Sequence, residues 1–243
     1  MFTKIDKNQI TFIDSRFYLN EAGQHFPSVT TILEAYPKPY QLMQWLKEVG
    51  TKADDIRDAA GKRGSVVHSL TEEYDNGLEV ALLDETGNPT VSMKEWAMFE
   101  KYVEFTEKAK PVHSLIEQNF VDEAGGYAGT IDRICEIDGK IILLDIKTSN
   151  GIYNNYWLQL AAYREGIKNT AGIEVDEVAI LWLNAKTRSS GKKGDMQGVG
   201  WQLIVREDTE KEMELFKNVH ALWLAEHGNE IPKNYSYQLS HKK

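Results

Sequence analysis

The pair Asp138-Gly139, set between two runs of mainly aliphatic residues, constrains the fold of this chain more than any other feature. An Asp-Gly pair readily takes the positive φ values of a two-residue type I′ turn, so the segment predicts a β-hairpin. In that hairpin Ile137 pairs with Lys140. Counting back along the same register places Asp132 directly opposite Asp145, where facing Cβ atoms lie about 4.5 to 5.5 Å apart. Two carboxylates are therefore expected to converge on one face.

Converging carboxylates repel one another, and at neutral pH they need a shared proton, a cation or both. Mg²⁺ or Mn²⁺ suits them, because hard cations take oxygen ligands and keep waters that a substrate phosphate can displace. Lys147 follows Asp145 by two residues, so the strand period places both on the same face. There the ammonium group can orient an attacking water and stabilise charge on a phosphate. The alternative is a plain hairpin with solvated acids and a lysine on its outer face, since Asp-x-Lys is common by chance.

The helix expected after the hairpin carries Gln159 and Tyr163 four residues apart, hence on one helical face. The segments GTID, DIKTS and QLAAY follow one another between Gly126 and Tyr163. In order and spacing they resemble the RecB-like nucleases of the PD-(D/E)xK superfamily. The Pro-Asp pair of that superfamily is Ile131-Asp132 here, which is a departure from the pattern.

The resemblance implies an α/β fold of the restriction-endonuclease-like type, with a mixed central β-sheet flanked by helices and an N-terminal helical elaboration. It implies that Asp132 and Asp145 hold the metal and that Lys147 serves the nucleophilic water. We expect the carbonyl of Ile146 to join the metal ligands. The residues expected to shape the site or contact nucleic acid are Gln159, Tyr163, Arg63 and Thr148.

Further upstream, the segments PSVTTIL and GKRGSVVHSLTEEY are similar to the mitochondrial genome maintenance exonuclease and related phage exonucleases. A lone helical histidine is usually structural, but RGSVVH matches the RG-x-x-x-H pattern of that family. The resemblance therefore implies that His68 binds metal through a neutral imidazole or contacts the scissile phosphate. Arg63, one turn earlier, would anchor a neighbouring phosphate or a DNA end.

Glu117 falls near the middle of the segment VHSLIEQNFVD, which alternates as a strand. In relatives a glutamate here lies near the metals, so the resemblance makes Glu117 a candidate for supporting the first cation or binding a second. The alternative is a surface acid on an edge strand.

Several classes of protein are excluded by what the sequence lacks. The single cysteine, Cys135, rules out an internal disulfide and a four-cysteine zinc or iron-sulfur site. No GxxxxGK[ST] loop is present, so the chain encodes no ATP-driven motor. A helicase or recombinase partner would have to be another chain.

The net charge of -9 is unusual for a DNA-binding protein, but the local field matters more than the total. Basic residues cluster at Lys62-Arg63, at Lys186 to Lys193 and at Lys233 to Lys243. Each cluster is either a DNA contact or simply a solvated surface.

At 243 residues the chain is expected to form one nuclease domain. We expect a hairpin and helical part over 1–110, a catalytic core over 111–230 and a tail over 231–243. The patterns predict a hairpin over 5–19 with its turn near Asp14-Ser15, a short helix capped by Ser28 or Thr30, helices over 39–50 and 93–109, strands over 177–184 and 199–206, and a loop over 189–198. They also predict a helix over 210–227 that buries Leu215, Phe216, Val219, Leu222 and Trp223.

The chain shows no apolar run of the ~20 residues that a membrane helix requires, and its N-terminus resembles neither a signal nor a transit peptide. A cytoplasmic protein of a bacterium or a phage-infected cell is expected.

Together these features predict a Mg²⁺-dependent or Mn²⁺-dependent DNA exonuclease that acts from single-stranded or double-stranded ends in phage or prophage recombination or in repair. The alternatives are an endonuclease of the same fold, a catalytically silent module that binds DNA or a partner, and a glycosidase with Asp132 and Asp145 as acid and base. Lys147 counts against the glycosidase. The sequence does not determine the strand polarity of cleavage, whether the substrate is DNA or RNA, or the oligomeric state.

Overall fold

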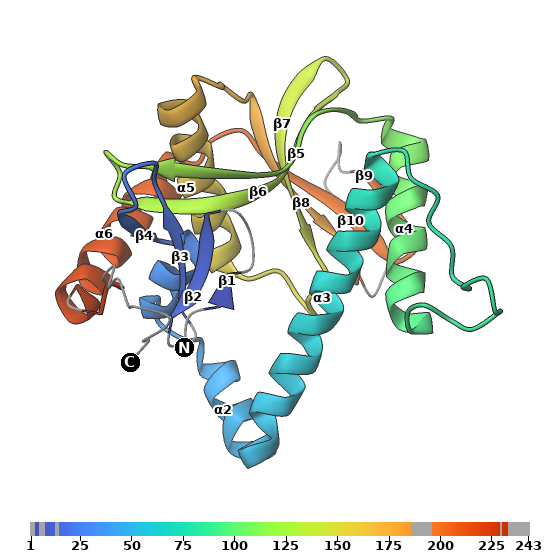
Figure 1. The fold of residues 1–243 in the computed structure, drawn as a ribbon, viewed down its shortest axis with the longest axis horizontal. Helices are drawn as coiled ribbons and strands as arrows, with labels where there is room; N and C mark the ends of the chain where they lie inside the picture. Colours follow the sequence, from blue (N-terminus) through green and yellow to red (C-terminus); the bar gives the residue numbers. More distant parts are fainter. Residues whose placement is uncertain (1–2, 5–7, 13–14, 186–195, 229, 233–243) are drawn as a thin grey trace, which may run out of the picture.

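The computed structural model describes residues 3–4, 8–12, 15–185, 196–228 and 230–232, and two β-sheets form its framework (Figure 1). The larger sheet contains, in spatial order, β5 (Val112–Asp122), β6 (Tyr127–Ile137), β7 (Lys140–Lys147), β8 (Glu177–Trp182), β10 (Trp201–Arg206) and β9 (Met196–Gly198). β7 and β8 run parallel, whereas the other neighbours run antiparallel. The predicted mixed sheet of an α/β protein is confirmed.

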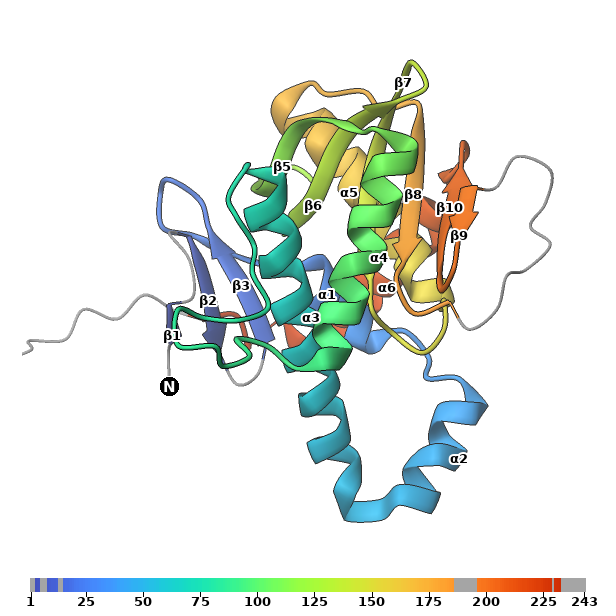
Figure 2. The ribbon, with the colours of Figure 1, turned by 90° about the vertical axis from the view of Figure 1, so that its right-hand side faces the viewer.

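Helices cover both faces of this sheet, α3 (Ala53–Asp75) and α4 (Met93–Ala109) on one side and α5 (Asn154–Ala171) and α6 (Glu210–His227) on the other (Figure 2). On the first side, Phe105 of α4 packs in one cluster with Leu144 of β7. On the second side, Leu160 of α5 packs in another cluster with Leu143. The side chains of successive strand residues thus pack into hydrophobic clusters on opposite faces of the sheet, as the two-residue period of a strand requires.

The predicted hairpin has the expected register. Asp138 and Gly139 have φ values of 52° and 79°. The pairing runs from Ile137 with Lys140 back to Arg133 with Leu144. Both turn residues therefore adopt the left-handed conformation that the Asp-Gly pair predicts.

The N-terminal part forms a smaller antiparallel sheet where the sequence predicts only a hairpin. That sheet contains β1 (Thr3–Lys4), β2 (Gln9–Phe12), β3 (Ser15–Leu19) and β4 (His25–Pro27). β2 and β3 are the predicted hairpin, whereas β1 and β4 are too short to show a pattern. Ser28 caps α1 (Val29–Ile32), as expected, by accepting a hydrogen bond from the Thr31 amide.

Beyond the 3₁₀ turn η1 (Leu33–Ala35), α2 (Tyr40–Val49) ends at Gly50, as predicted, and the turn η2 (Gly50–Lys52) leads into α3. α2 and the first half of α3 project from the body of the protein (Figure 2). No residue of α2 is buried. The second half of α3 returns to the sheet, and α4 runs beside it.

The α6 face differs from the prediction. Phe216, Val219 and Trp223 are buried, but Leu215 and Leu222 are 41% and 49% exposed. A helix against a sheet buries only one stripe of its surface, and these two leucines flank that stripe.

The basic segments 186–193 and 233–243, most of the loop 189–198 and most of the tail 231–243 lie outside the described residues. Among the helices that are described, none is long and apolar enough to cross a membrane.

A buried ion pair that no sequence pattern predicts joins α3 and α4 to the sheet. The guanidinium of Arg133 is fully buried, and its Nε lies 2.6 Å from Asp75 Oδ2 at the end of α3. Asp75 also accepts a hydrogen bond of 2.5 Å from Tyr102 of α4 and lies 3.4 Å from His113 Nε2 of β5. This cluster fixes the end of α3 against β5 and β6.

Replacing Gly166 of α5 by alanine should destabilise the fold. A Cβ at Gly166 would overlap the ring of Phe120, which is buried and cannot move away cheaply. We expect a loss of about 2 kcal/mol in the free energy of unfolding, measured by urea denaturation. Gly61→Ala in α3 is the matched control, because its Cβ meets nothing within 4 Å. That change should stabilise by up to about 1 kcal/mol through helix propensity. Equal effects of the two changes would contradict this account.

Asp75→Asn should cost about 3 kcal/mol of unfolding free energy at pH 7, because it removes one partner of a buried ion pair. Burial raises the pKa of Asp75, but hydrogen bonds from His113, Tyr102 and Arg133 outweigh it and hold that pKa below the usual range. The stabilisation is therefore present above about pH 4 and is lost as the pH falls through the folded-state pKa. Urea denaturation of both proteins at pH 7 and pH 3 should show the difference shrinking; a constant difference would refute the assignment.

Candidate metal centre

The hairpin ladder stops one position before the two predicted aspartates. Arg133 and Leu144 are the last hydrogen-bonded pair. Beyond them the backbone amide of Ile146 donates to Asp132 Oδ2 at 2.7 Å. The carboxylate of Asp132 thus takes the place of a strand carbonyl between β6 and β7. It is held by the backbone and is only 12% exposed.

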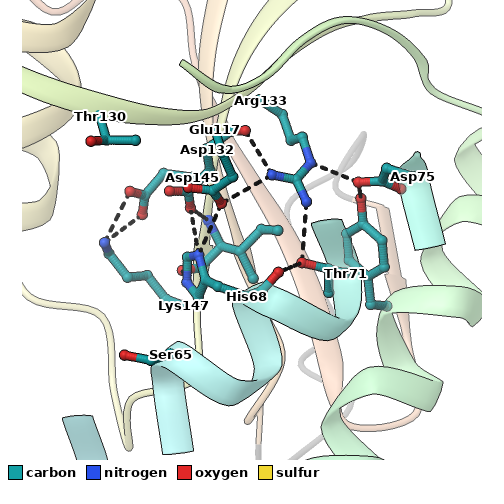
Figure 3. A network of polar contacts seen from close by, with 12 residues as sticks. Ser65, His68, Thr71, Asp75, Glu117, Thr130, Asp132, Arg133, Asp145 and Lys147 are labelled. Atoms are coloured by element: carbon teal, nitrogen blue, oxygen red, sulfur yellow. Dashed lines mark hydrogen bonds and ion pairs between the residues drawn. The ribbon is translucent and has the colours of Figure 1, made fainter. Parts of the chain in front are cut away.

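Asp132 belongs to a group of three side chains from three different elements (Figure 3). His68 of α3 has its Nδ1 3.6 Å from Asp132 Oδ2 and 3.6 Å from Glu117 Oε1 of β5. One nitrogen or oxygen atom from each residue lies within 4.8 Å of the others. Glu117 lies across β5 and β6 from Asp132. The residues on either side are paired, Ile116 with Arg133 and Gln118 with Ile131, and the backbone φ of Glu117 is 47°.

The geometry of this group suits one divalent cation. His68 Nε2 lies 3.0 Å from the carbonyl oxygen of Ile146. If Nε2 donates there, the lone pair on Nδ1 is directed at the two carboxylates, the usual way in which a carbonyl orients a metal-binding imidazole. The 3.6 Å separations exceed hydrogen-bond length. Ligand atoms around one small cation are themselves about 3 to 4 Å apart, so the group can hold such an ion.

Asp145 lies in an adjoining group, with Lys147 as its main partner. Lys147 Nζ lies 2.7 and 2.9 Å from the two oxygens of Asp145 and 3.2 Å from Gln159 Oε1. Gln159 in turn donates to the hydroxyl of Tyr163 at 3.0 Å. The predicted shared faces of the strand and of the helix are therefore present. The face of the Tyr156 ring, 4.7 Å from Nζ, completes the surroundings of the ammonium group.

Negative charge dominates the electrostatics of the two groups. Burial alone would lower the pKa of His68, but Asp132 and Glu117 raise it to about 9. Burial, reinforced by Asp132, raises the pKa of Asp145 to about 6 although Lys147 opposes this. His68 therefore retains a proton beside the carboxylates where a cation would otherwise supply the positive charge.

A pocket of about 250 Å³ opens next to these groups, between α3 and the end of β7. Its walls are formed by Ala60, Gly61, Arg63, Gly64, His68, Ile146, Lys147, Thr148, Ser149 and Tyr156. Gly64 allows close approach, since a Cβ there would lie 3.4 Å from Thr148 Oγ1. Arg63 lines this pocket, and its Nε finds no hydrogen-bond partner among the described residues.

The structure thus divides the predicted site into two adjoining groups and a pocket. His68 and Glu117 lie with Asp132, whereas Gln159 and Tyr163 lie with Asp145 and Lys147. The Ile146 carbonyl faces His68, so its role as a metal ligand stays a prediction, as does a cation shared by Asp132 and Asp145. Tyr156 and Arg133 were missed. Arg133 could have been noticed as a charged residue on the same strand face as buried Cys135.

Comparisons with known proteins add little information on function to this geometry. No protein-family model and no curated protein matches the chain. A crystal structure of a protein from Eubacterium rectale, provisionally named an exonuclease, has 14% sequence identity and a TM-score of 0.40. The match covers 65% of this chain and 64% of that one, so this chain spans less than two thirds of its length. So distant a match leaves the function to be argued from the residues of the site.

Proposed function

We propose that this protein is a metal-dependent nuclease that hydrolyses phosphodiester bonds in DNA and acts from strand ends. The observation that carries the proposal is the convergence of His68, Glu117 and Asp132 from three elements on one point, beside the ion pair of Asp145 and Lys147. Such a pairing of a cation site with a buried lysine serves reactions in which charge develops on a phosphate. A plain solvated hairpin would leave these side chains exposed, but Asp132 and Asp145 are 12% and 3% exposed.

The donor set points to Mg²⁺ or Mn²⁺. Two carboxylates provide the oxygen ligands that hard cations prefer, and one imidazole is compatible with Mn²⁺. When bound, such a cation lowers the pKa of a coordinated water and neutralises charge on the phosphate. Asp132 would be the central ligand, because the Ile146 amide fixes its carboxylate.

Lys147 is assigned to the attacking water and to the phosphate. Its ammonium group is held by Asp145 and Gln159, and the Tyr156 ring closes one side. These contacts limit the positions that the flexible lysine chain can occupy, so that little entropy is lost when a substrate binds. A positive charge fixed there can orient the water and stabilise the charge that grows on the phosphate.

The pocket between α3 and β7 is assigned to the nucleic-acid backbone. Its wall carries Arg63, whose guanidinium can bind a phosphate with two parallel hydrogen bonds. Gly64 packs closely on Thr148 in the wall of this pocket, whereas the Cβ position of Gly61 has nothing within 4 Å, so the wall is open beside Gly61. Binding therefore depends on a local positive group and on the cation, in spite of the net charge of -9.

Action from ends, and a role in phage or prophage recombination or repair beside a helicase or recombinase chain, rest on the resemblance of the motifs to RecB-like exonucleases of the PD-(D/E)xK superfamily. An endonuclease of the same fold is the main alternative, because the site itself imposes no requirement for an end. A silent DNA-binding module is disfavoured because Asp132, Asp145 and Lys147 are all present.

Lys147→Ala should lower the cleavage rate by about 100-fold or more, because it removes a preorganised charge from the site. Cleavage would be measured on oligonucleotides labelled at the 5′ or the 3′ end, single-stranded, duplex or circular, with Mg²⁺, Mn²⁺ or EDTA. Lys168→Ala is the matched control, since Lys168 pairs with Glu174 at the far end of α5. We expect the control to cut as the wild type does.

The same assay separates the alternatives. Metal-dependent loss of linear DNA that spares circles supports the exonuclease and reveals its polarity. Cutting of circles would replace it by the endonuclease. DNA binding without any cleavage would establish the silent module instead.

Asp132→Asn should weaken Mn²⁺ binding by more than about tenfold, and by more than Asp145→Asn does. The reason is that Asp132 lies with His68 and Glu117, whereas Asp145 is occupied by Lys147. Titration calorimetry with Mn²⁺ measures both affinities without catalysis. Equal losses would mean that both carboxylates hold the ion directly, and unchanged affinity in Asp132→Asn would refute the assigned centre.

A further inference from the structure

Arg133 lies beside the candidate metal centre, between it and Asp75, and each nitrogen of its guanidinium donates a hydrogen bond (Figure 3). Nε donates to Asp75 at 2.6 Å, and Nη2 donates to Thr71 Oγ1 at 3.2 Å. Nη1 donates to Glu117 Oε1 at 3.1 Å and to the carbonyl oxygen of Asp132 at 2.7 Å. The side chain is 0% exposed, and four of its five N–H groups have these acceptors in place of water.

These contacts reach each of the three residues that converge on the cation position. Glu117 is held directly through its carboxylate, and Asp132 through its backbone carbonyl. His68 is reached through Thr71, which accepts from Arg133 and donates to the backbone carbonyl of His68 at 2.9 Å. One guanidinium therefore connects α3, β5 and β6 at the level of the centre.

Glu117 depends most on this support. Its φ of 47° is uncommon for a residue with a side chain and is unusual within a strand. Such a conformation persists only where the surroundings hold it. The Glu117 side chain is 22% exposed, and Arg133 fixes the same oxygen, Oε1, that lies 3.6 Å from His68 Nδ1.

We propose that Arg133 is a positioning residue of the metal centre: it holds Glu117, Asp132 and, through Thr71, His68 in the arrangement that one divalent cation requires. The inference rests on the proposed function and adds a residue to it. Asp75, held by Tyr102 and His113, anchors the guanidinium from behind. Arginine is needed because its planar fork bonds several acceptors at fixed angles, whereas the ammonium group of lysine is a single point charge.

The test is a double-mutant cycle on Mn²⁺ affinity, followed by electron paramagnetic resonance of free Mn²⁺. Arg133→Lys keeps the charge but loses the fork, and we expect Mn²⁺ binding about tenfold weaker or more. In a Glu117→Gln background the same change should weaken binding much less, because the ligand that Arg133 holds is already altered. Arg164→Lys is the matched control, since among the described residues Arg164 donates only to the carbonyls of Glu207 and Val175. It should leave Mn²⁺ affinity unchanged.

Full additivity in the cycle, or unchanged affinity in Arg133→Lys while the wild type binds Mn²⁺ and cuts DNA, would overturn this inference alone. A wild type that neither binds Mn²⁺ nor cuts would overturn the proposed function with it. If Arg133→Lys does not fold, Thr71→Val decides, because it removes the link to His68 with little change in volume. Weaker Mn²⁺ binding by a folded Thr71→Val protein supports the inference, and wild-type affinity refutes it.

Discussion

The hydrogen bond from the Ile146 amide to the Asp132 carboxylate determines how the rest of the centre is built. In a regular hairpin that amide would bond a strand carbonyl, and the carboxylate would point away from the ladder. Here the carboxylate is part of the ladder. If Asp132 moved away, a buried backbone N–H would lose its partner, at a cost of about 1 to 3 kcal/mol. The candidate ligand is therefore as rigid as the sheet that carries it.

Near this hydrogen bond, the side chains of β6 switch the face of the sheet to which they point. A regular strand would put residues 131, 133 and 135 on one face. Ile131 nevertheless packs in the cluster with α5 and α6, whereas Cys135 packs in the cluster with α4. The change falls at the level of Asp132 and of Glu117, with its positive φ. The irregularity lets Asp132 meet His68 on the side of α3 while Arg133, the next residue, also faces α3.

Local periodicity explains which parts of the site could be predicted from the sequence. The turn at Asp138-Gly139 sets the hairpin register, and spacings of two and four residues bring Lys147 to Asp145 and Gln159 to Tyr163. Contacts across the fold carry no such signal. Nothing in the sequence links Arg133 to Asp75, which lies 58 residues earlier on another element. Likewise, nothing distinguishes an exposed Leu222 from a buried Trp223 before the helix is placed against the sheet.

The charges of the centre favour a cation there, and they bear on how an acidic protein would serve the proposed nuclease function. The charged groups joined by the contacts described above are the carboxylates of Asp75, Glu117, Asp132 and Asp145 and the side chains of Arg133, Lys147 and protonated His68. Four negative charges against three positive ones leave an excess of one, and the excess rises to two when His68 gives up its proton to act as a ligand. A carboxylate excess in a poorly hydrated site is costly, and a divalent cation is the ligand that removes it. In the proposed function, the negative charge that would weaken attraction to DNA elsewhere on the surface is here the source of affinity for the cation.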